Sequence, residues 1–538
     1  MTLGFRYQFL RSGAHLRVMT APASSYEGWT REDLIARLTQ LDSPKVQNPS
    51  EAQPGPVRPP KPFNFSSFSR RKIALKFCYS GWEYNGLAFQ LGPTPLPTVE
   101  GTLFEALAQA RLIDPEAGFE GCEWERCGRT DRGVSAAGQV VSLWVRSALG
   151  GDEPEDVDMD VSPKDRNTVQ NNSSSRVELE EESVNTSALD GDLAFMDDLS
   201  DSDSPYSPPL PGKKTSEHRY VSILNRILPP TIRVLAWSPV SPTFSARFAC
   251  GHRHYKYFFS PDGLDINLMR NAAMRLVGEH DFRNLCKLDA TKQITSFKRK
   301  ILRADISSVD GRDGDDDSNM HVLDLIGTAF LYHQVRHIMA ILFLVGTGLE
   351  HPSVVSSLLN VESELEQPWK GEPPLEVVDC KPDYQMADAL PLMLWECAYA
   401  ENDVLWRTNG DDDGGEGEDL AGTSSGLYHQ LHSIHARSVM HSILDAQFLS
   451  AAAAFHSPPQ RHFPLSLTGF TPSAKFDGQG VMCIPLGGGT FKRTSKYVPL
   501  LKRNRLDNVA VANERWRVGK GFRRDERRKA EAREDGDE

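Results

Sequence analysis

The sequence predicts an α+β protein in which strand and helix patterns alternate through two successive halves. Three stretches indicate the first half: the alternating run "RKIALKFCYSG", the helix-period run "VEGTLFEALAQARLI", and an alternating strand from Val141 to Val145. Similar patterns recur from Pro239 to Tyr399. Strands and helices that each have one apolar face fold by burying those faces against one another. The chain of 538 residues is long enough for more than one such core.

Each expected element of the first half has one apolar face. The first strand alternates apolar and polar residues up to a turn at Gly81, and the following helix has its apolar residues at helical spacing. A second helix, in "HRYVSILNRILPP", ends at Pro229 and Pro230, and a strand follows it. The residues expected to face the core are Ile73, Leu75 and Phe77 in the first strand and Leu103, Phe104, Leu107 and Leu112 in the first helix.

The second half shows the same two periodicities. The strand "HYKYFFS" is followed by the capped helix "DINLMRNAAMRLVG". The run "HVLDLIGTAFLYHQVRHIMAILFLVG" indicates a strand, a break at Gly327 and a helix. The residues expected to share the buried faces are Tyr255, Tyr257 and Phe259 in the strand, Ile266, Met269, Ala273 and Leu276 in the first helix, and Val335, Ile338, Met339, Leu342 and Phe343 in the second.

Composition divides the chain into four parts. An acidic, serine-rich stretch without apolar periodicity interrupts the first half, and we predict that it is disordered. The expected parts are an N-terminal extension (1–69) with a short amphipathic helix over Thr30–Leu41 and a proline-rich linker, a first half (70–238) with the acidic insert at about 148–216, a second half (239–400), and an acidic linker with a basic C-terminal region (401–538).

The acidic charge of the chain is concentrated in three segments. The whole chain has a net charge of −13, but Gly151–Leu210, Gly311–Met320 and Glu401–Leu420 together carry −24. The remainder is therefore basic, with a net charge of about +11. A basic globular part with acidic insertions fits a nucleic-acid partner, although solvated surface charge explains the same counts.

Cysteine spacing and hydropathy exclude several classes of protein. Eight cysteines without a CxxC pair form neither a disulfide framework nor a zinc framework, which favours a reducing compartment. We expect no metal site, because Cys250, His252 and His254 have no matching second pair of ligands. The longest apolar run, Ile338–Gly346, is too short to span a membrane, so we expect no membrane partner.

A polar, glycine-bracketed turn precedes the second strand of the first half, in "CGRTDRGVSAAGQVVSLWV". Gly128 and Gly133 allow the backbone to turn sharply, so Arg129 and Asp131 are displayed on a loop at the mouth of the sheet. On the pattern alone, a turn residue that caps its own backbone explains Asp131 as well as a reactive carboxylate does.

Cations surround an aromatic residue in "FSARFACGHRHYKYFF". Arg247, Arg253 and Lys256 lie close to Tyr255 in the sequence, a pattern typical of surfaces that stack bases and contact phosphates. A core tyrosine with solvated basic neighbours is the alternative. Arg336 lies beside the apolar stripe of the last helix, where an arginine that extends its charge into solvent is equally consistent.

In combination, these motifs resemble those of a known family. "CGRTDRGVSA" resembles the GRTD-x-GV signature of TruA-type tRNA pseudouridine synthases, and "LNRILPP", "ARFACGHRHYKY", "AFLYHQVRHIM" and "PLMLWECAY" resemble further motifs of that family in the same order. The resemblance covers residues 71–399 apart from the acidic insert. "YSGWEYNGLAFQ", "PTVEGTLFEAL" and the C-terminal "KYVPLLKRNRLDNVAVANERWR" look most like the eukaryotic enzymes that modify tRNA positions 38 and 39.

The resemblance implies a fold, a partner and an assembly. Two ferredoxin-like (RRM-like) halves would form one mixed, mostly antiparallel sheet with a central basic cleft. The substrate would be tRNA, modified in its anticodon stem-loop, with no cofactor, and the dimeric bacterial members imply a homodimer. The nucleus and cytoplasm are the expected locations. The first residues, "MTLGFRYQFLRSGAHLRVM", contain three arginines and no acid, so mitochondrial targeting is an alternative unless Met19 is the start.

The resemblance also assigns residues. Asp131 matches the essential aspartate of the family, Tyr255 its active-site tyrosine, and Arg336 the arginine that pairs with the aspartate. Arg129 and Arg247 would bind the RNA. In the reaction the C1′–N1 bond of uridine breaks, the ring turns, and C5 bonds to C1′. A carboxylate can either attack the sugar or take its C2′ proton, and the sequence leaves both open.

Two other functions share some of these features. An N-glycosidic hydrolase acting on RNA would also use carboxylate chemistry, but it needs a second acid near the bond and no motif places one. A catalytically silent RNA-binding protein with RRM-like sheets would carry an aromatic RNP octapeptide, which the sequence lacks. Asp131 separates the second alternative from the enzyme, because a binder has no use for an acid that faces phosphates.

Overall fold

One β-sheet runs through both halves of the chain. Nearly all of the acidic insert and the expected helix over Thr30–Leu41 lie outside the described residues. The described residues from Asn64 onward belong to one compact unit. No helix among them is both long and apolar enough to cross a membrane. The computed structural model describes residues 63–149, 216–309, 320–408, 424–456 and 482–527, with residues 364 and 525 excepted.

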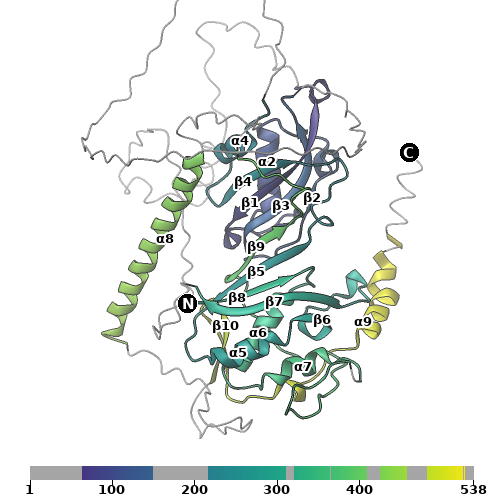
Figure 1. Cartoon of the computed structure of the whole chain (residues 1–538), viewed down its shortest axis with the longest axis vertical. Coiled ribbons are helices and arrows are strands. Elements are labelled where there is room, and N and C mark those ends of the chain that lie inside the picture. Colours follow the sequence, from purple (N-terminus) through teal and green to yellow (C-terminus); the bar gives the residue numbers. More distant parts are fainter. Residues whose placement is uncertain are drawn as a thin grey trace, which may run out of the picture. The chain divides into compact units, whose positions relative to one another are not determined.

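Within the described ranges the sheet has nine strands, in the order β4-β1-β3-β9-β5-β8-β7-β6 with β2 paired to β3 (Figure 1). All neighbouring strands are antiparallel except β3 and β9, which run parallel. The expected mixed, mostly antiparallel sheet is therefore confirmed. The strands are β1 (Arg70–Tyr79), β2 (Glu125–Arg126), β3 (Ser135–Arg146), β4 (Ile232–Pro239), β5 (His252–Phe259), β6 (Gly278–Asp281), β7 (Lys298–Ser308), β8 (His321–Gly327) and β9 (Leu392–Ala398).

The two halves meet where β3 pairs with β9. Ser135 lies opposite Met393 and Ala136 opposite Leu394 in this short parallel pairing. On its other side β9 pairs antiparallel with β5. This strand from late in the chain therefore joins the strands of the two halves into one sheet. The loop that carries Asp131 leads directly into β3 and therefore lies at this seam.

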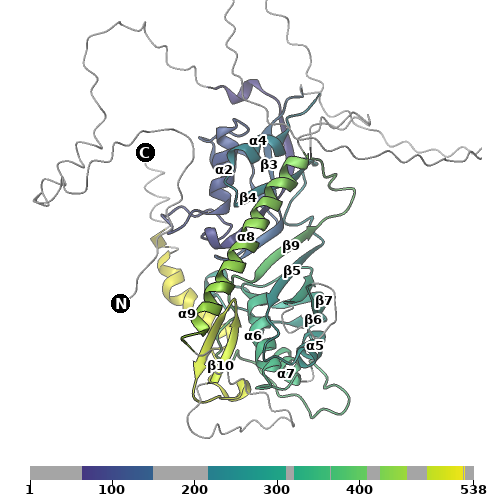
Figure 2. The ribbon, with the colours of Figure 1, turned by 90° about the vertical axis from the view of Figure 1, so that its left-hand side faces the viewer.

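Helices α2 (Val99–Gln109) and α4 (Tyr220–Ile227) pack on the first half of the sheet (Figure 2). Thr98 caps α2, because its side chain accepts a hydrogen bond from the amide of Gly101. A short helix, α3 (Gly118–Gly121), precedes β2. The predicted core positions are confirmed: Ile73, Leu75, Phe77, Leu103 and Leu107 are fully buried, Leu112 is buried just beyond α2, and Phe104 is partly buried.

Helices α5 (Ile266–Met274), α6 (Gln334–Gly346) and α7 (Ser353–Leu359) form the core of the second half. The side chain of Asp265 caps α5 by accepting a hydrogen bond from the amide of Leu268. The expected stripe of α6 is confirmed, and the helix is buried on nearly all sides. Its buried stripe residues are Val335, Ile338, Met339, Leu342 and Phe343, joined by Met269 and Ala273 from α5 and Leu276 just after it.

The C-terminal region contains α8 (Ser424–Ala453), the hairpin β10 (Met482–Gly487) and β11 (Thr490–Thr494), and α9 (Val509–Trp516). Strand β10 lies beside α6 (Figure 2). The Tyr257 hydroxyl donates a hydrogen bond to the carbonyl of Leu486 at 3.2 Å, and Leu500 is fully buried in the second core. Ile484 and Leu500 of this region are thus part of the core of the second half.

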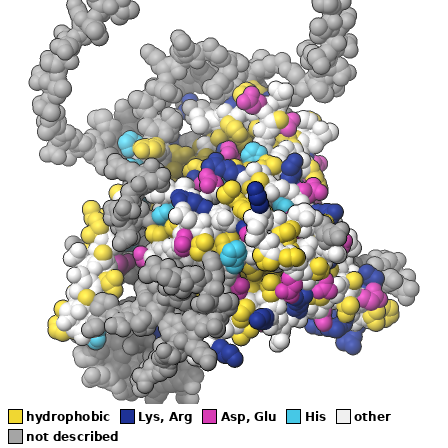
Figure 3. Space-filling view, turned by 60° about the horizontal axis from the view of Figure 1, so that its bottom comes forward, with side chains coloured by type: hydrophobic (Ala, Val, Ile, Leu, Met, Phe, Trp, Pro, Cys, Tyr) yellow, Lys and Arg dark blue, Asp and Glu magenta, His cyan; other side chains and the backbone are white. Residues whose placement is uncertain are grey.

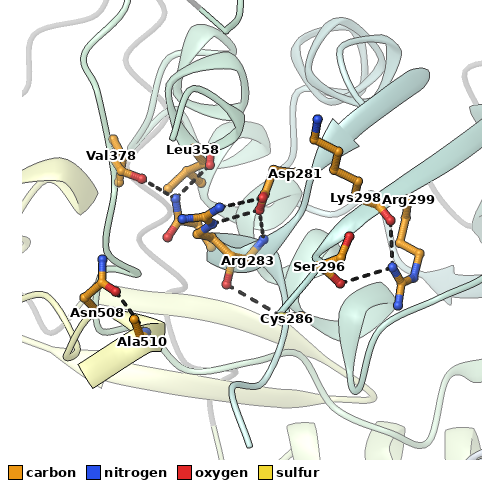
Figure 4. Close-up of polar contacts among 11 residues, drawn as sticks. Asp281, Arg283, Cys286, Ser296, Lys298, Arg299, Leu358, Val378, Asn508 and Ala510 are labelled. Atoms are coloured by element: carbon orange, nitrogen blue, oxygen red, sulfur yellow. Dashed lines mark hydrogen bonds and ion pairs between the residues drawn. The ribbon is translucent and has the colours of Figure 1, made fainter. Parts of the chain in front are cut away.

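Two side-chain contacts fix the loop that follows β6 (Figure 4). Asp281 pairs with Arg283 at 2.8 Å. Asn284 donates from its side-chain amide to the carbonyls of Leu358 and Val378, at 2.9 and 2.6 Å. Because these carbonyls come from α7 and from the segment after it, Asn284 ties the loop to both of them.

His337 of α6 is buried together with Lys381. The ammonium of Lys381 lies 3.2 Å from the nearer ring nitrogen of His337 and donates to the carbonyl of Cys286 at 2.5 Å. Burial, followed by the charge of Lys381, lowers the pKa of His337 to about 2. Burial also lowers the pKa of Lys381 to about 8. The imidazole is therefore neutral in the folded protein at neutral pH.

We expect the protein to lose stability in acid because of His337. In the unfolded chain this ring protonates near pH 6.5, while in the folded protein it does so only near its pKa of about 2. Below pH 6.5 the unfolded state binds the extra proton, so the free energy of unfolding falls by up to about 1.4 kcal/mol per pH unit. Denaturant unfolding between pH 7 and 5 measures this slope.

His337→Gln should flatten that slope, because a neutral amide does not titrate. His429→Gln, at an exposed position on α8, is the matched control and should leave the slope unchanged. Identical slopes in the wild type and His337→Gln would show that His337 does not cause the loss of stability in acid.

Candidate active site

The loop that carries Asp131 is anchored on both sides. Gly133 adopts a φ of 86°, which only glycine reaches without strain, and the amide of Val134 donates to the carbonyl of Asp131 at 3.1 Å. The buried hydroxyl of Thr130 is hydrogen-bonded to the hydroxyl of Tyr79 on β1 at 2.5 Å. The backbone carbonyl of Thr130 accepts from the amide of Leu87 at 3.2 Å. The Asp131 side chain therefore projects from a fixed turn.

The carboxylate of Asp131 is in contact with the imidazole of His333. Oδ2 of Asp131 lies 3.2 Å from Nε2 of His333, the residue that precedes α6. The side chain of Asp131 is 26% exposed, whereas that of His333 is 7% exposed. Asp131 is thus supported from inside the protein and open on one side, as a group that reacts with a bound molecule must be.

Arg253 connects the segments that surround Asp131. Its guanidinium donates hydrogen bonds to four backbone carbonyls, those of Arg247 (2.7 Å), Thr328 (2.7 Å), Cys250 (3.1 Å) and Cys127 (3.2 Å). These carbonyls belong to the start of the Asp131 loop, the loop before β5 and the turn after β8. The sequence analysis grouped Arg253 with phosphate-contacting cations, but in the structure its donors are directed at the backbone.

Tyr255 lies in β5 between the two cores. Its ring meets that of Phe330 edge to face, with centroids 4.9 Å apart, and the side chain is partly buried. Burial raises the pKa of Tyr255 far above its ordinary value, and the negative charge of Asp131 acts in the same direction. The hydroxyl therefore stays protonated and is able to donate a proton or a hydrogen bond.

Arg336 is held by the segment that precedes β9. Its Nε donates to the carbonyl of Ala387 at 2.8 Å, and the amide of Ala387 donates back to the carbonyl of Arg336 at 3.1 Å. Within the described part of the chain, no ion pair joins Arg336 to Asp131; the carboxylate contacts His333 instead. The role of Arg336 in the reaction stays a prediction.

The two predicted RNA-binding arginines are both exposed. Arg129 lies in the Asp131 loop, and the Arg247 guanidinium lies 5.2 Å from the ring centroid of Phe248, which is itself 78% exposed. No carboxylate among the described residues forms an ion pair with either arginine. Their charges are available to an anionic ligand.

Sequence reasoning missed His333 and its neighbour. The ring of Tyr332 lies 3.8 Å from that of His333, and the ammonium of Lys292 lies 3.9 Å from the Tyr332 centroid. Both residues stand inside the motif "AFLYHQVRHIM", but only Arg336 was selected from it. The left-handed backbone of His333, which directs its ring, leaves no signature in the residue pattern.

Several known proteins are similar to this chain in sequence. A family model described as tRNA pseudouridine synthase matches residues 272–400. The tRNA pseudouridine(38/39) synthase of Saccharomyces cerevisiae is 36% identical over 404 residues, which are 72% of this chain and 74% of the yeast protein. The human protein of the same name is 37% identical over 70% of this chain and 65% of its own length. The tRNA pseudouridine synthase A of Methanosarcina mazei is 29% identical over 54% of this chain and 76% of its own.

The described site combines an aspartate on a fixed loop, a histidine in contact with its carboxylate and a partly buried tyrosine on β5. The chain belongs to the TruA family of tRNA pseudouridine synthases, which are isomerases. The resemblance seen in the sequence motifs is thereby confirmed, with eukaryotic relatives at 36 to 39% identity.

We expect Arg253→Lys to destabilise the fold by about 3 kcal/mol, because one ammonium cannot satisfy four carbonyls that lie in different directions. Urea unfolding measures the loss. Arg247→Lys, at an exposed position six residues earlier, should change the free energy of unfolding by less than about 0.5 kcal/mol. Equal stability of the two variants would show that the Arg253 hydrogen bonds are dispensable.

Proposed function

We propose that this protein converts uridine to pseudouridine at positions 38 and 39 of the tRNA anticodon arm, with Asp131 as the catalytic carboxylate. The observation that carries the proposal is the Asp131 loop, which presents a partly exposed carboxylate at the seam between the halves. The yeast and human relatives, named for positions 38 and 39, support the choice of substrate.

The reaction is an isomerisation, so it needs no oxidant, and the uracil that leaves C1′ is re-attached to the same sugar. The C1′–N1 bond breaks, the uracil ring turns, C5 bonds to C1′, C5 loses its proton and N1 gains one. Asp131 either bonds to C1′ and is later displaced by C5, or removes the C2′ proton and returns it. Both routes use an ionised carboxylate with a free oxygen.

Tyr255 and Arg336 have distinct roles in this proposal. The protonated hydroxyl of Tyr255 and its ring, which is held by Phe330, support a base that has been turned out of its stack. Arg336, fixed by Ala387, supplies positive charge beside the reacting nucleotide. Arg129 and Arg247 contact phosphates at the mouth of the site.

Besides Arg129 and Arg247, a group of cations in the C-terminal region supports the proposal of RNA binding. A cavity of about 350 Å³ beside the β10–β11 hairpin is lined by Lys492, Lys496, Lys502 and Arg503. Lys and Arg side chains also gather at the end of the molecule where α9 lies (Figure 3). Exposed cations of this kind contact a nucleic-acid backbone without reading its sequence.

The finer architecture and assembly belong to the same proposal. We infer that each half is a ferredoxin-like unit and that RNA enters a basic cleft between them, because the seam carries Asp131 and the exposed arginines lie beside it. The family resemblance supports a homodimer. It also supports a nuclear and cytoplasmic location, with mitochondrial targeting as the alternative.

Asp131→Asn should abolish pseudouridine formation. The amide keeps the size of the carboxylate but is neither a nucleophile nor a base, so we expect turnover on a tRNA transcript with uridine at positions 38 and 39 to fall by about 10⁴-fold. Binding of the same tRNA should be unchanged. Asp305→Asn, which removes an exposed carboxylate on β7, is the matched control and should retain full activity.

The same assay separates the alternatives. Release of free uracil by the wild type would identify an N-glycosidic hydrolase. Tight tRNA binding without any product would identify a silent RNA-binding protein. Substantial turnover by Asp131→Asn would overturn the assignment of the catalytic carboxylate.

A further inference from the structure

His333 has a backbone conformation that is unusual for its residue type. Its φ of 59° and ψ of 14° are left-handed, a region that is sterically unfavourable for a residue with a Cβ atom. Several hydrogen bonds impose it. The amide of His337 donates to the carbonyl of His333 at 3.0 Å, and Oε1 of Gln334 accepts from the amide of Leu331 at 2.7 Å. Strain of this kind persists where it directs a functional side chain.

The left-handed turn directs the imidazole to Asp131. Nε2 of the ring lies 3.2 Å from Oδ2 of the carboxylate. Nδ1 is buried and has no hydrogen-bond partner among the described residues, so Nε2 is the ring nitrogen that faces the site.

The surroundings of His333 prevent the ring from turning away. Tyr332 lies against it, with ring centroids 3.8 Å apart. Tyr332 is itself fixed by the ammonium groups of Lys287 and Lys292, which lie 5.3 and 3.9 Å from its centroid. One turn further along, His337 contacts Lys381 at 3.2 Å, so the two histidines have different partners.

We propose that His333 is the positioning residue for the catalytic carboxylate, an inference that rests on the proposed function. Through the contact of 3.2 Å between its Nε2 and Oδ2, His333 fixes the plane of the carboxyl group and leaves Oδ1 as the oxygen that meets the ribose. No hydrogen bond within the described residues occupies Oδ1. Both candidate reactions, attack at C1′ and removal of the C2′ proton, require one oxygen at a defined angle to the sugar.

His333→Gly tests this role with little disturbance of the backbone, because glycine adopts the left-handed conformation freely. We expect kcat for pseudouridine formation to fall by about 10²-fold while KM for tRNA changes less than about twofold. Added imidazole should restore part of kcat by occupying the vacated space. It should not restore Asp131→Asn. His333→Asn, which tolerates this backbone and keeps an N–H donor, should retain more activity than the glycine variant.

Arg111→Gly is the matched control, because Arg111 is an exposed left-handed residue (φ 54°) in another part of the fold. It should keep the wild-type kcat. Wild-type kcat in His333→Gly, or a lowered kcat that imidazole does not raise, would overturn the proposal. If His333→Gly fails to fold, His333→Asn is compared with His333→Ala instead. The proposal is overturned if His333→Asn has the wild-type melting temperature but a kcat no higher than that of His333→Ala. An inactive wild type would instead refute the proposed function itself.

Discussion

The geometry of the site depends on the guanidinium of Arg253. Its hydrogen bonds reach the carbonyls of Cys127, Cys250 and Thr328 and that of Arg247, so one side chain joins three segments that are far apart in the sequence. A planar fork with five donors suits this task, and no other side chain offers as many N–H groups in fixed directions. The position of the Asp131 loop relative to β5 and β8 therefore follows from a single partly buried cation.

The seam between β3 and β9 explains why Asp131 lies where it does. A parallel pairing as short as that of Ser135 and Ala136 leaves the preceding loop without a strand partner. That loop is held by Tyr79 from β1 and by His333 from the start of α6. Both halves of the protein thus contribute to the support of Asp131.

The elements were predictable from the sequence because their apolar periodicity reports burial directly. The stripe of α6, the alternation in β1 and the display of Asp131 on a glycine-bracketed turn needed only local information. The function of Arg253 was not predictable, because an arginine that binds carbonyls and one that binds phosphates look alike in a sequence. His333 was missed for a related reason: its partner is distant in the chain, and its left-handed backbone is imposed by neighbours.

The basic C-terminal region packs against the second core and helps to hold the segment that fixes Arg336. Gly487 has a φ of 86°, and a Cβ atom there would lie 2.2 Å from the hydroxyl of Tyr257, so the hairpin is fitted closely to the second core. The carbonyl of Leu486 also accepts from the amide of Asp388, the residue after the one that holds Arg336. Deleting the region would therefore expose core and loosen Arg336 together. Charge-removing substitutions at exposed lysines such as Lys492 and Lys496 would change the charge of this region without removing its support of Arg336.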